Sequence, residues 1–262
     1  MSKKKINYNI DIIIPNFNKG RFLEEAIRSV INQSYKNWKL YIVDDNSNDN
    51  SKIILNKYLK NKKINIFFLK KNRGPSYCRN YAIKKSNSNF IAFLDSDDFW
   101  TNKKLFEQIT FMKKNNYSLT YSDYISFYQI KDKIKIIGKT NIRNNFNFES
   151  FIKDSSMNTS TLILKRTLIN YVKFRNLKKL EDYIFKCDIF KKNKKIFAYK
   201  FQRHSAYYRI IKNARSSSKV KNLFYLWKYN YQFNKLSFLK NLKSIVLISL
   251  NSIKKYGLKM GV

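Results

Sequence analysis

A chain of 262 residues can bury a hydrophobic core of its own, so folding requires neither disulfides nor a structural metal. Its two cysteines, Cys78 and Cys187, lack CxxC spacing, which argues against a disulfide framework or a zinc site and is typical of a reducing compartment. The formal charge of +37 predicts attraction to phosphate-bearing partners such as nucleic acid, anionic lipid or phosphorylated ligands.

The first hundred residues alternate between strand-like and helix-like segments. A continuous apolar run over 10–15 predicts a strand that is covered on both faces of its sheet. Apolar residues within 21–33 recur at helical spacing and predict a helix with one buried stripe. This alternation is typical of parallel strands joined by right-handed helical crossovers. The same reasoning predicts strands over 38–43, 64–69 and 90–94 and helices over 49–60 and 75–85.

Polar clusters directly follow three of these strands, at 15–18, 44–45 and 95–98. Because ligands bind beyond the carboxyl ends of parallel strands, we expect the clusters to converge on one cleft. A helix cap or turn explains a single aspartate after a strand. It explains three acidic residues within four positions poorly, because like charges repel unless a cation joins them.

The second half of the chain alternates less regularly. Its basic, aromatic tail has its most apolar stretch at 244–253, about ten residues, whereas a membrane-spanning helix needs ~20. We expect the tail either to lie on an anionic membrane face or to pack on the domain as an amphipathic helix. The other elements predicted here are a helix over 105–114, strands or a hairpin over 118–121 and 125–137, a strand over 161–165, a helix over 181–192 and a strand over 206–211.

Four sequence blocks resemble the family 2 nucleotide-sugar glycosyltransferases of GT-A fold. They are IDIIIPNFNKGRFLEEAIRSVINQSYKNWKLYIVDDNSNDNS at 10–51, NRGPSYCRNYAI at 72–83, FIAFLDSDDFW at 90–100 and LEDYIF at 180–185. The resemblance implies an α/β fold, with a Rossmann-like, mostly parallel sheet flanked by helices. It also implies an inverting enzyme that moves a sugar from a nucleotide diphosphate to an acceptor hydroxyl.

The expected domain organisation follows from the same resemblance. Residues 1–218 would form the catalytic domain, with a nucleotide-binding half at 1–115 and an acceptor-side half at 116–218. Residues 219–262 would form the helical tail.

The first two blocks imply a nucleotide pocket. By position, Pro15 and Phe17 would line the base, and the ring of Phe17 would stack on it. Asp45 would accept a hydrogen bond from the imide N–H of uracil or thymine, which favours a UDP- or dTDP-sugar and leaves cytosine and guanine open. Arg79 would grip base or phosphate oxygens, with a solvated surface position as the alternative.

Asp95-Ser96-Asp97 resembles the DxD signature. In this family a carboxylate-held Mn²⁺ or Mg²⁺ neutralises the leaving diphosphate. Asp97 is the expected metal ligand, and Asp95 would hold the ribose or a metal-bound water. Many relatives carry a histidine after a Tyr-Arg pair, but isoleucine follows Arg209 here, so Arg209 and Arg215 become candidates for the diphosphate contact.

Glu181-Asp182 resembles the acidic pair that faces the donor from the acceptor side. Inversion by direct displacement needs a carboxylate that takes the proton of the attacking hydroxyl. Asp182 is the expected base and Glu181 an acceptor-binding partner. The alternative is that both are ordinary acids at a helix N-terminus, where the helix dipole favours them.

Two other classes fit part of the sequence: a basic nucleic-acid-binding protein and a catalytically inactive relative. Unless metal-bound, the acidic clusters would repel phosphates, so no nucleic-acid partner is expected. A Rossmann dehydrogenase is disfavoured because no GxGxxG follows the first strand. The expected partners are a nucleotide-sugar donor, a glycan or lipid-linked glycan acceptor from surface polysaccharide or lipopolysaccharide assembly, and an anionic membrane surface.

The expected location is the cytoplasm, with peripheral attachment to the cytoplasmic face of the inner membrane. The N-terminal residues carry positive charge but lack the apolar run and cleavage site of a signal peptide.

Overall fold

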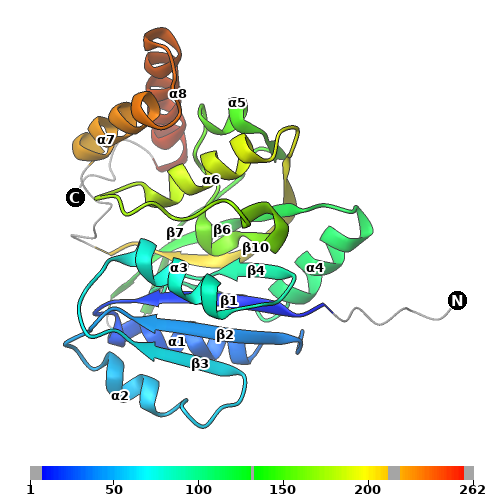
Figure 1. Ribbon diagram of the computed structural model, residues 1–262, viewed down its shortest axis with the longest axis vertical. Helices are drawn as coiled ribbons and strands as arrows, with labels where there is room; N and C mark the ends of the chain where they lie inside the picture. Colours follow the sequence, from blue (N-terminus) through cyan, green and yellow to red (C-terminus); the bar gives the residue numbers. More distant parts are fainter. Residues whose placement is uncertain (1–7, 131–132, 212–218, 257–262) are drawn as a thin grey trace, which may run out of the picture.

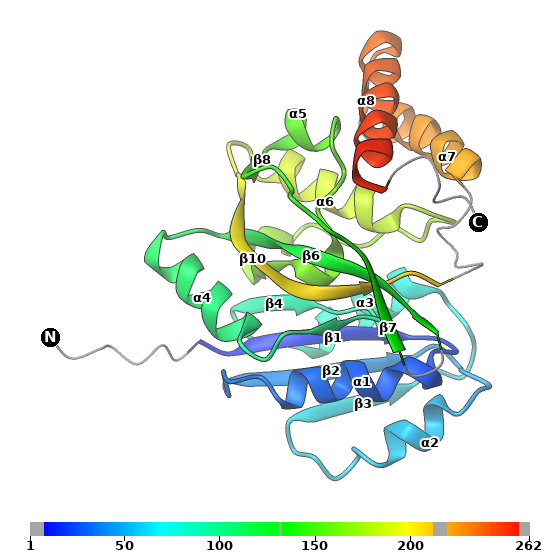
Figure 2. The same ribbon diagram turned by 180° about the vertical axis from the view of Figure 1, so that it is seen from behind.

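The computed structural model describes residues 8–130, 133–211 and 219–256. These residues form one mixed sheet, and Figures 1 and 2 show helices covering both of its faces. The strands are β1 (Ile10–Asn16), β2 (Trp38–Asp44), β3 (Ile64–Phe68), β4 (Phe90–Phe93), β5 (Phe99–Trp100), β6 (Leu119–Ile130), β7 (Lys133–Lys139), β8 (Asn145–Phe146), β9 (Ile163–Lys165) and β10 (Ala198–Arg209). The α-helices are α1 (Gly20–Ile31), α2 (Ser51–Asn56), α3 (Pro75–Lys85), α4 (Lys104–Lys114), α5 (Phe148–Phe151), α6 (Glu181–Lys192), α7 (Lys219–Gln232) and α8 (Phe238–Tyr256).

The half of the sheet formed by the first hundred residues is parallel, as its sequence predicts. Strands β3, β2, β1 and β4 are neighbours in that order, and every pair among them is parallel. Residues Ile12, Ile13 and Ile14 of β1 are completely buried. Helix α3 lies on one face of β1 and α1 lies on the other (Figures 1 and 2). The continuous apolar run therefore reflects a strand that is covered on both faces.

The other half of the sheet is mixed. Strand β9 is antiparallel to both β4 and β6, whereas β10 is parallel to β6. The sheet order continues from β4 through β9, β6 and β10 to β5, with β7 beside β6 and β8 beside β10. The expected hairpin is present, because β6 and β7 pair antiparallel.

Two strands extend beyond their predicted limits. Strand β6 runs unbroken through residues 122–124, and β10 begins at Ala198 rather than at 206. Buried polar side chains interrupt the apolar pattern there: the hydroxyls of Ser122 and Ser205 lie 2.6 Å apart, and Asp123 pairs with Lys200 at 3.3 Å. Because these partners are on different strands, the apolar spacing within one strand does not reveal them.

The two tail helices pack on the second half of the chain. Helices α7 and α8 contact each other and lie beside α5 and α6 (Figure 1). The Tyr183 hydroxyl of α6 donates to Asn230 Oδ1 at 2.8 Å, and Leu226 and Tyr229 are buried in the core. Among the described residues, no helix has the length and apolar character that crossing a bilayer demands.

Candidate active site

The first two polar clusters meet at the carboxyl ends of β1 and β2. Asn16 Nδ2 donates to Asp44 Oδ1 at 2.7 Å, and Asp44 also accepts the backbone N–H and the hydroxyl of Ser47. Asp44 is completely buried. Its carboxylate therefore fixes the loop after β2, in which the buried Asp45 is the next residue.

Asp45 holds the loop that precedes α3. Its two carboxylate oxygens accept the backbone N–H groups of Arg73 at 2.7 Å and Gly74 at 2.8 Å. Gly74 has φ +85°, a conformation that favours glycine. Each carboxylate oxygen has a second lone pair, so Asp45 retains the capacity to accept a hydrogen bond from a base.

The two residues expected beside the base differ in exposure. Pro15 is buried within β1, whereas Phe17, just past its end, is 44% exposed. An aromatic residue at this position could equally have belonged to the core, and the exposure of Phe17 rules that out. An exposed ring is available for stacking on a base.

Arg79 is buried between the two halves of the site. Its Nη2 donates to Asp95 Oδ1 at 2.7 Å, and its Nη1 lies 3.6 Å from Glu181 Oε1. The guanidinium also stacks over Phe174, with 5.2 Å from Cζ to the ring centroid. The residue is only 5% exposed, so the solvated alternative is wrong.

The same guanidinium has unused donors. Within the described part of the chain, Nε and Nη1 of Arg79 are buried and make no hydrogen bond. Buried donors without a partner are costly, and a bound ligand with acceptor oxygens would satisfy them. These two groups point to an oxygen-rich ligand.

The acidic cluster after β4 is held from several sides. Asp97 Oδ2 lies 2.8 Å from Lys19 Nζ. Asp98 accepts the Ser160 hydroxyl at 2.7 Å and the backbone N–H of Arg209 at 3.0 Å. Burial, followed by the charges of Asp97 and Asp95, raises the pKa of Asp98 well above its usual value. Burial also raises the pKa of Asp97, although Lys19 opposes that shift.

The donor set at this loop fits a divalent cation. Asp95 and Asp97 supply hard carboxylate oxygens, and their mutual repulsion would be relieved by a cation. In the described residues no three His, Cys, Asp or Glu side chains gather into a complete metal site. Mg²⁺ is usually held by one or two carboxylates plus phosphates and water, so a pair of aspartates suits an ion shared with a diphosphate.

The two acidic residues at the start of α6 differ in their exposure to solvent. Glu181 is buried towards Arg79, whereas the side chain of Asp182 is 40% exposed. Asp182 Oδ2 accepts from Lys186 Nζ at 2.9 Å and from Thr159 Oγ1 at 3.2 Å.

The surroundings of Asp182 keep its carboxylate ionised. Burial by itself would raise the pKa of Asp182. The Lys186 ammonium, supported by Arg79 and by the Thr159 hydroxyl, outweighs it and lowers the pKa to about 2. Both acids do lie in the first helical turn, as the helix-dipole alternative expects. That alternative does not account for the ion pair between Asp182 and the buried Lys186.

Arg209 does not face an open donor site. Its guanidinium contacts Glu25 and Gln129 and lies between the rings of Phe22 and Phe127. Its Nε donates to the backbone carbonyl of Asp97 at 2.9 Å, so Arg209 holds the backbone of the acidic loop in place.

Two basic residues close to Arg209 in the sequence remain, Arg215 and His204. The other candidate for the diphosphate, Arg215, lies outside the described residues. His204 is five residues upstream of Arg209 on β10, and its Nε2 lies 2.9 Å from the Thr140 carbonyl oxygen.

Sequence reasoning missed three residues that contact the candidate site. Lys186 follows Asp182 by four residues on a predicted helix, a spacing that brings side chains together and could have revealed it. Lys19 follows the first polar cluster directly, but only the fold shows that it reaches Asp97. Ser160 has no local signal, because its partner Asp98 is 62 positions away.

A sheet of this order, with acidic clusters at the carboxyl ends of β2 and β4, is the GT-A fold. The sequence matches the model of glycosyl transferase family 2 over residues 11–183, and the chain belongs to that family.

Several relatives are similar over most of both chains, and the name of one of them states its reaction. The Escherichia coli protein WfgD, named UDP-Glc:alpha-D-GlcNAc-diphosphoundecaprenol beta-1,3-glucosyltransferase, is 34% identical over 221 residues, which cover 84% of this chain and 85% of WfgD.

Two solved structures share the fold. S. aureus TarS 1-349 in complex with UDP-GlcNAc superposes with a TM-score of 0.71 at 18% identity, covering 94% of this chain and 73% of that one. The mannosyltransferase PcManGT from Pyrobaculum calidifontis, in complex with GDP-Man and Mn²⁺, gives 0.69 at 12% identity, covering 98% and 74%.

Proposed function

We propose that this glycosyltransferase moves a hexosyl or related sugar, with inversion, from a UDP- or dTDP-sugar to a hydroxyl of a glycan or lipid-linked glycan acceptor. The observation that carries the proposal is the bridge made by Arg79. It contacts Asp95 on the donor side and Glu181 on the acceptor side, directly next to Asp182. A sugar seated against Arg79 would therefore have the donor machinery on one side and an ionised carboxylate on the other.

The nucleotide would be held by the first two clusters. Phe17 offers an exposed ring for stacking, Pro15 lies at the end of β1, and Asp45 offers acceptor capacity for an imide N–H. Complexes and names of relatives support a nucleoside diphosphate: TarS binds UDP-GlcNAc, and WfgD is named for UDP-Glc. PcManGT binds GDP-Man, so a purine donor is the principal alternative that the experiment below must test.

Asp97 would hold a divalent ion, Mn²⁺ or Mg²⁺, with Asp95 beside it, and the Mn²⁺ in the PcManGT complex supports this assignment. When bound, the ion would neutralise the charge that grows on the leaving diphosphate. The unused Nε and Nη1 donors of Arg79 would bind donor oxygens. Lys19 would have to leave Asp97, and its ammonium would then be available to the diphosphate.

Asp182 would act as the general base. Its low pKa keeps it ionised, and it needs little intrinsic basicity, because the attacking hydroxyl becomes strongly acidic as its oxygen bonds to the anomeric carbon. Lys186 and Thr159 both bind Oδ2 and so fix the orientation of the carboxylate. Glu181, held near Arg79, would bind the acceptor.

The setting we propose is the assembly of surface polysaccharide or lipopolysaccharide, at the cytoplasmic face of the inner membrane. The name of WfgD specifies an acceptor linked to diphosphoundecaprenol, which supports a lipid-linked substrate. Such an acceptor is presented at a membrane surface.

The test is thermal stability of the purified protein with UDP, dTDP, GDP or CDP, each with and without Mn²⁺. A metal-dependent rise with UDP or dTDP, abolished in Asp97→Asn, is expected. A rise in thermal stability with GDP alone would show that the donor carries guanine, and the proposed pyrimidine donor would be wrong. No rise with any nucleotide, together with tight binding of nucleic acid, would overturn the proposal and favour a basic nucleic-acid-binding protein.

A further inference from the structure

Helix α8 carries an apolar stripe on its outer face. The stripe residues are 43% to 75% exposed, and they recur every three or four positions, which places them on one side of a helix. The opposite side contributes Asn241 and Ser244, which are buried. A helix on the surface of a protein ordinarily turns its apolar side inward, so an exposed stripe marks an interaction site. The stripe consists of Leu239, Leu242, Val246, Leu250 and Ile253.

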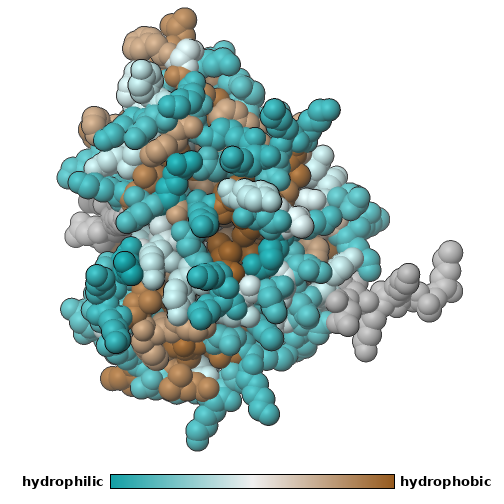
Figure 3. All heavy atoms as spheres, in the orientation of Figure 1, coloured by the Kyte–Doolittle hydropathy of each residue, from teal (hydrophilic) through white to brown (hydrophobic). Residues whose placement is uncertain are grey.

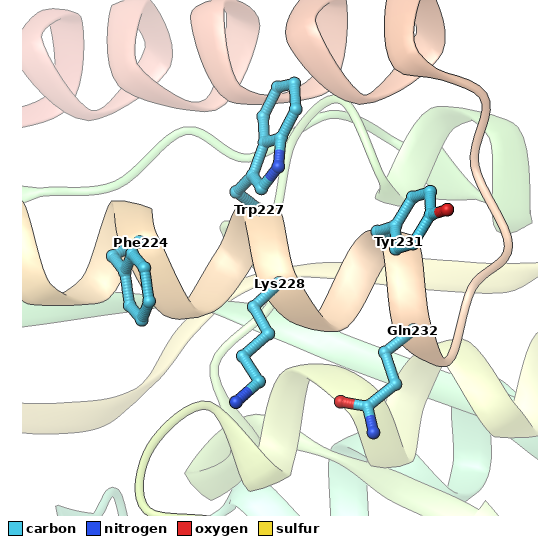
Figure 4. A pocket seen from close by; sticks show the side chains of 5 residues that line it. All are labelled: Phe224, Trp227, Lys228, Tyr231 and Gln232. Atoms are coloured by element: carbon cyan, nitrogen blue, oxygen red, sulfur yellow. The ribbon is translucent and has the colours of Figure 1, made fainter.

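Aromatic side chains of α7 continue this surface. The exposed rings of Phe224 and Tyr231, together with Trp227, line a hollow of about 490 Å³ (Figure 4). The Trp227 ring packs edge-on against Phe238 at the start of α8, with centroids 5.3 Å apart. Figure 3 shows apolar side chains among hydrophilic ones over these two helices. Rings with a polar edge are typical of side chains that lie at a membrane interface.

The two helices carry charge of one sign, and the acidic side chain recorded beside them is Glu149 of α5, 4.0 Å from Lys240 Nζ. Residues 219–256 contain eight lysines and no aspartate or glutamate, and the last acidic residue of the whole chain is Asp188. Lys228 lines the aromatic hollow, and Lys240 and Lys243 are exposed beside the stripe. Apolar residues flanked by lysines match a bilayer with anionic headgroups, because burial and charge attraction then add.

The same helices are fixed to the acceptor side of the site. Lys179 lies two residues before Glu181 in the sequence. Its Nζ donates to Asn222 Oδ1 of α7 at 2.9 Å. The Tyr183 hydroxyl, one residue after Asp182, donates to Asn230. A surface that rests on α7 and α8 is therefore held at a fixed orientation to Asp182.

We propose that the stripe of α8 and the aromatic hollow of α7 form a docking surface for an anionic lipid bilayer, on which the protein lies peripherally. The inference deepens the proposed function and rests on it only for the nature of the acceptor. Docking would orient the start of α6, which carries Asp182, relative to the bilayer in which a lipid-linked acceptor is anchored. The inner sides of both helices pack on the domain, and their outer sides would contact the bilayer. The two arrangements considered for the tail, packing on the domain and lying on a membrane, would thus occur together.

Trp227 provides a direct readout. It is one of three tryptophans, and the other two, Trp38 and Trp100, are buried in the core. Adding vesicles of phosphatidylcholine with phosphatidylglycerol to the full chain should shift tryptophan emission to shorter wavelength. Phosphatidylcholine vesicles should not, and Trp227→Phe should abolish the shift. Equal shifts with both vesicles, or none with either, would overturn the proposal.

Co-sedimentation with the same vesicles tests the residues. The double variant Leu242→Ser, Leu250→Ser should bind about ten-fold or more weakly, because each change removes an apolar side chain from the contact. The matched control is Ile53→Ser, Leu59→Ser, which alters exposed apolar residues in and beside α2 and should bind as the unaltered chain does. Circular dichroism establishes that both variants are folded.

A second pair of variants tests the charge. Lys240→Gln, Lys243→Gln should weaken binding and reduce its salt dependence, whereas the exposed pair Lys52→Gln, Lys60→Gln should not. If the stripe instead binds a second copy, sedimentation velocity would show a dimer that the leucine variant dissolves, and the proposal would be wrong. The vesicles contain neither donor nor glycan, so their failure to bind would leave the proposed transfer reaction untouched.

Discussion

Lys186 Nζ lies 2.9 Å from Oδ2 of Asp182, one turn earlier on α6. The lysine side chain is buried, and its ammonium also donates to the Met157 carbonyl at 2.8 Å. This cation holds the pKa of the candidate base at about 2 and fixes the direction of its carboxylate. It links the position of α6 to the chemistry that we propose.

Replacing Lys186 with methionine should move the acid limb of the pH profile. A carboxylate base is active when ionised, so kcat/KM falls as pH drops through its pKa. Removing the ammonium takes away the charge that offsets burial, so that pKa should rise from about 2 to around or above the usual ~3.9, and the acid limb should shift upward by about two pH units or more. The control is Lys191→Met, which removes an ion pair with Asp188 on the same helix and should leave the limb in place.

Asp182→Asn should lower kcat by about 10²- to 10⁴-fold, the usual contribution of a general base, while UDP affinity stays within about two-fold. Donor binding by titration calorimetry and turnover by released nucleotide separate the two effects. Asp188→Asn alters an acid of the same helix that pairs with Arg175 and should keep most activity. Full activity in the Asp182 variant would remove this residue from the mechanism.

Arg79→Lys should raise the donor KM and lower kcat, because one ammonium cannot reproduce the contacts of a planar guanidinium with both Asp95 and Glu181. The loss of a buried charge-assisted contact predicts at least a ten-fold fall in kcat/KM. Arg73→Lys, which alters an exposed guanidinium stacked on Tyr77, is the matched control. Wild-type kinetics in the Arg79 variant would contradict the bridging role.

Phe17→Ala should weaken nucleotide binding by about 10- to 100-fold, the range expected for one lost base stack. Its ring is partly exposed, so Tm without ligand should change little. Phe17→Tyr keeps a stacking face and should bind normally. Phe68→Ala, at a similarly exposed ring on β3, controls for the loss of an aromatic side chain. A nucleotide affinity unaffected in Phe17→Ala would place the base elsewhere.

Lys19→Met should increase affinity for Mn²⁺ in the absence of nucleotide, because the ammonium now neutralises Asp97 at 2.8 Å. The acidic cluster would then have no competing cation beside Asp97. Direct metal titration with a spectroscopic readout measures this, and Lys103→Met, at an exposed lysine before α4, serves as control. Unchanged or weaker Mn²⁺ binding would show that Lys19 does not compete for the site.

Some site residues could be predicted from their near neighbours in the sequence, whereas others depend on partners that are far away along the chain. The strand-end clusters at Asp45 and Asp95 were found because each follows an apolar run, and the structure places both at carboxyl ends of parallel strands. The burial of Arg79 could not be found in this way. Its partners Asp95 and Glu181 come from separate parts of the chain, and α3 must pack on the sheet before they meet.

The sequence by itself determined the order of strands and helices in the first hundred residues and the chemical types at their ends. This was possible because a strand buried on both faces requires a continuous apolar run, a requirement met within a few neighbouring residues. Only the tertiary structure decided that Ser160 holds Asp98, that Glu181 is buried while Asp182 stays partly exposed, and that the stripe of α8 stays uncovered. Those outcomes depend on burial and on pairing between distant segments, and local spacing does not encode either.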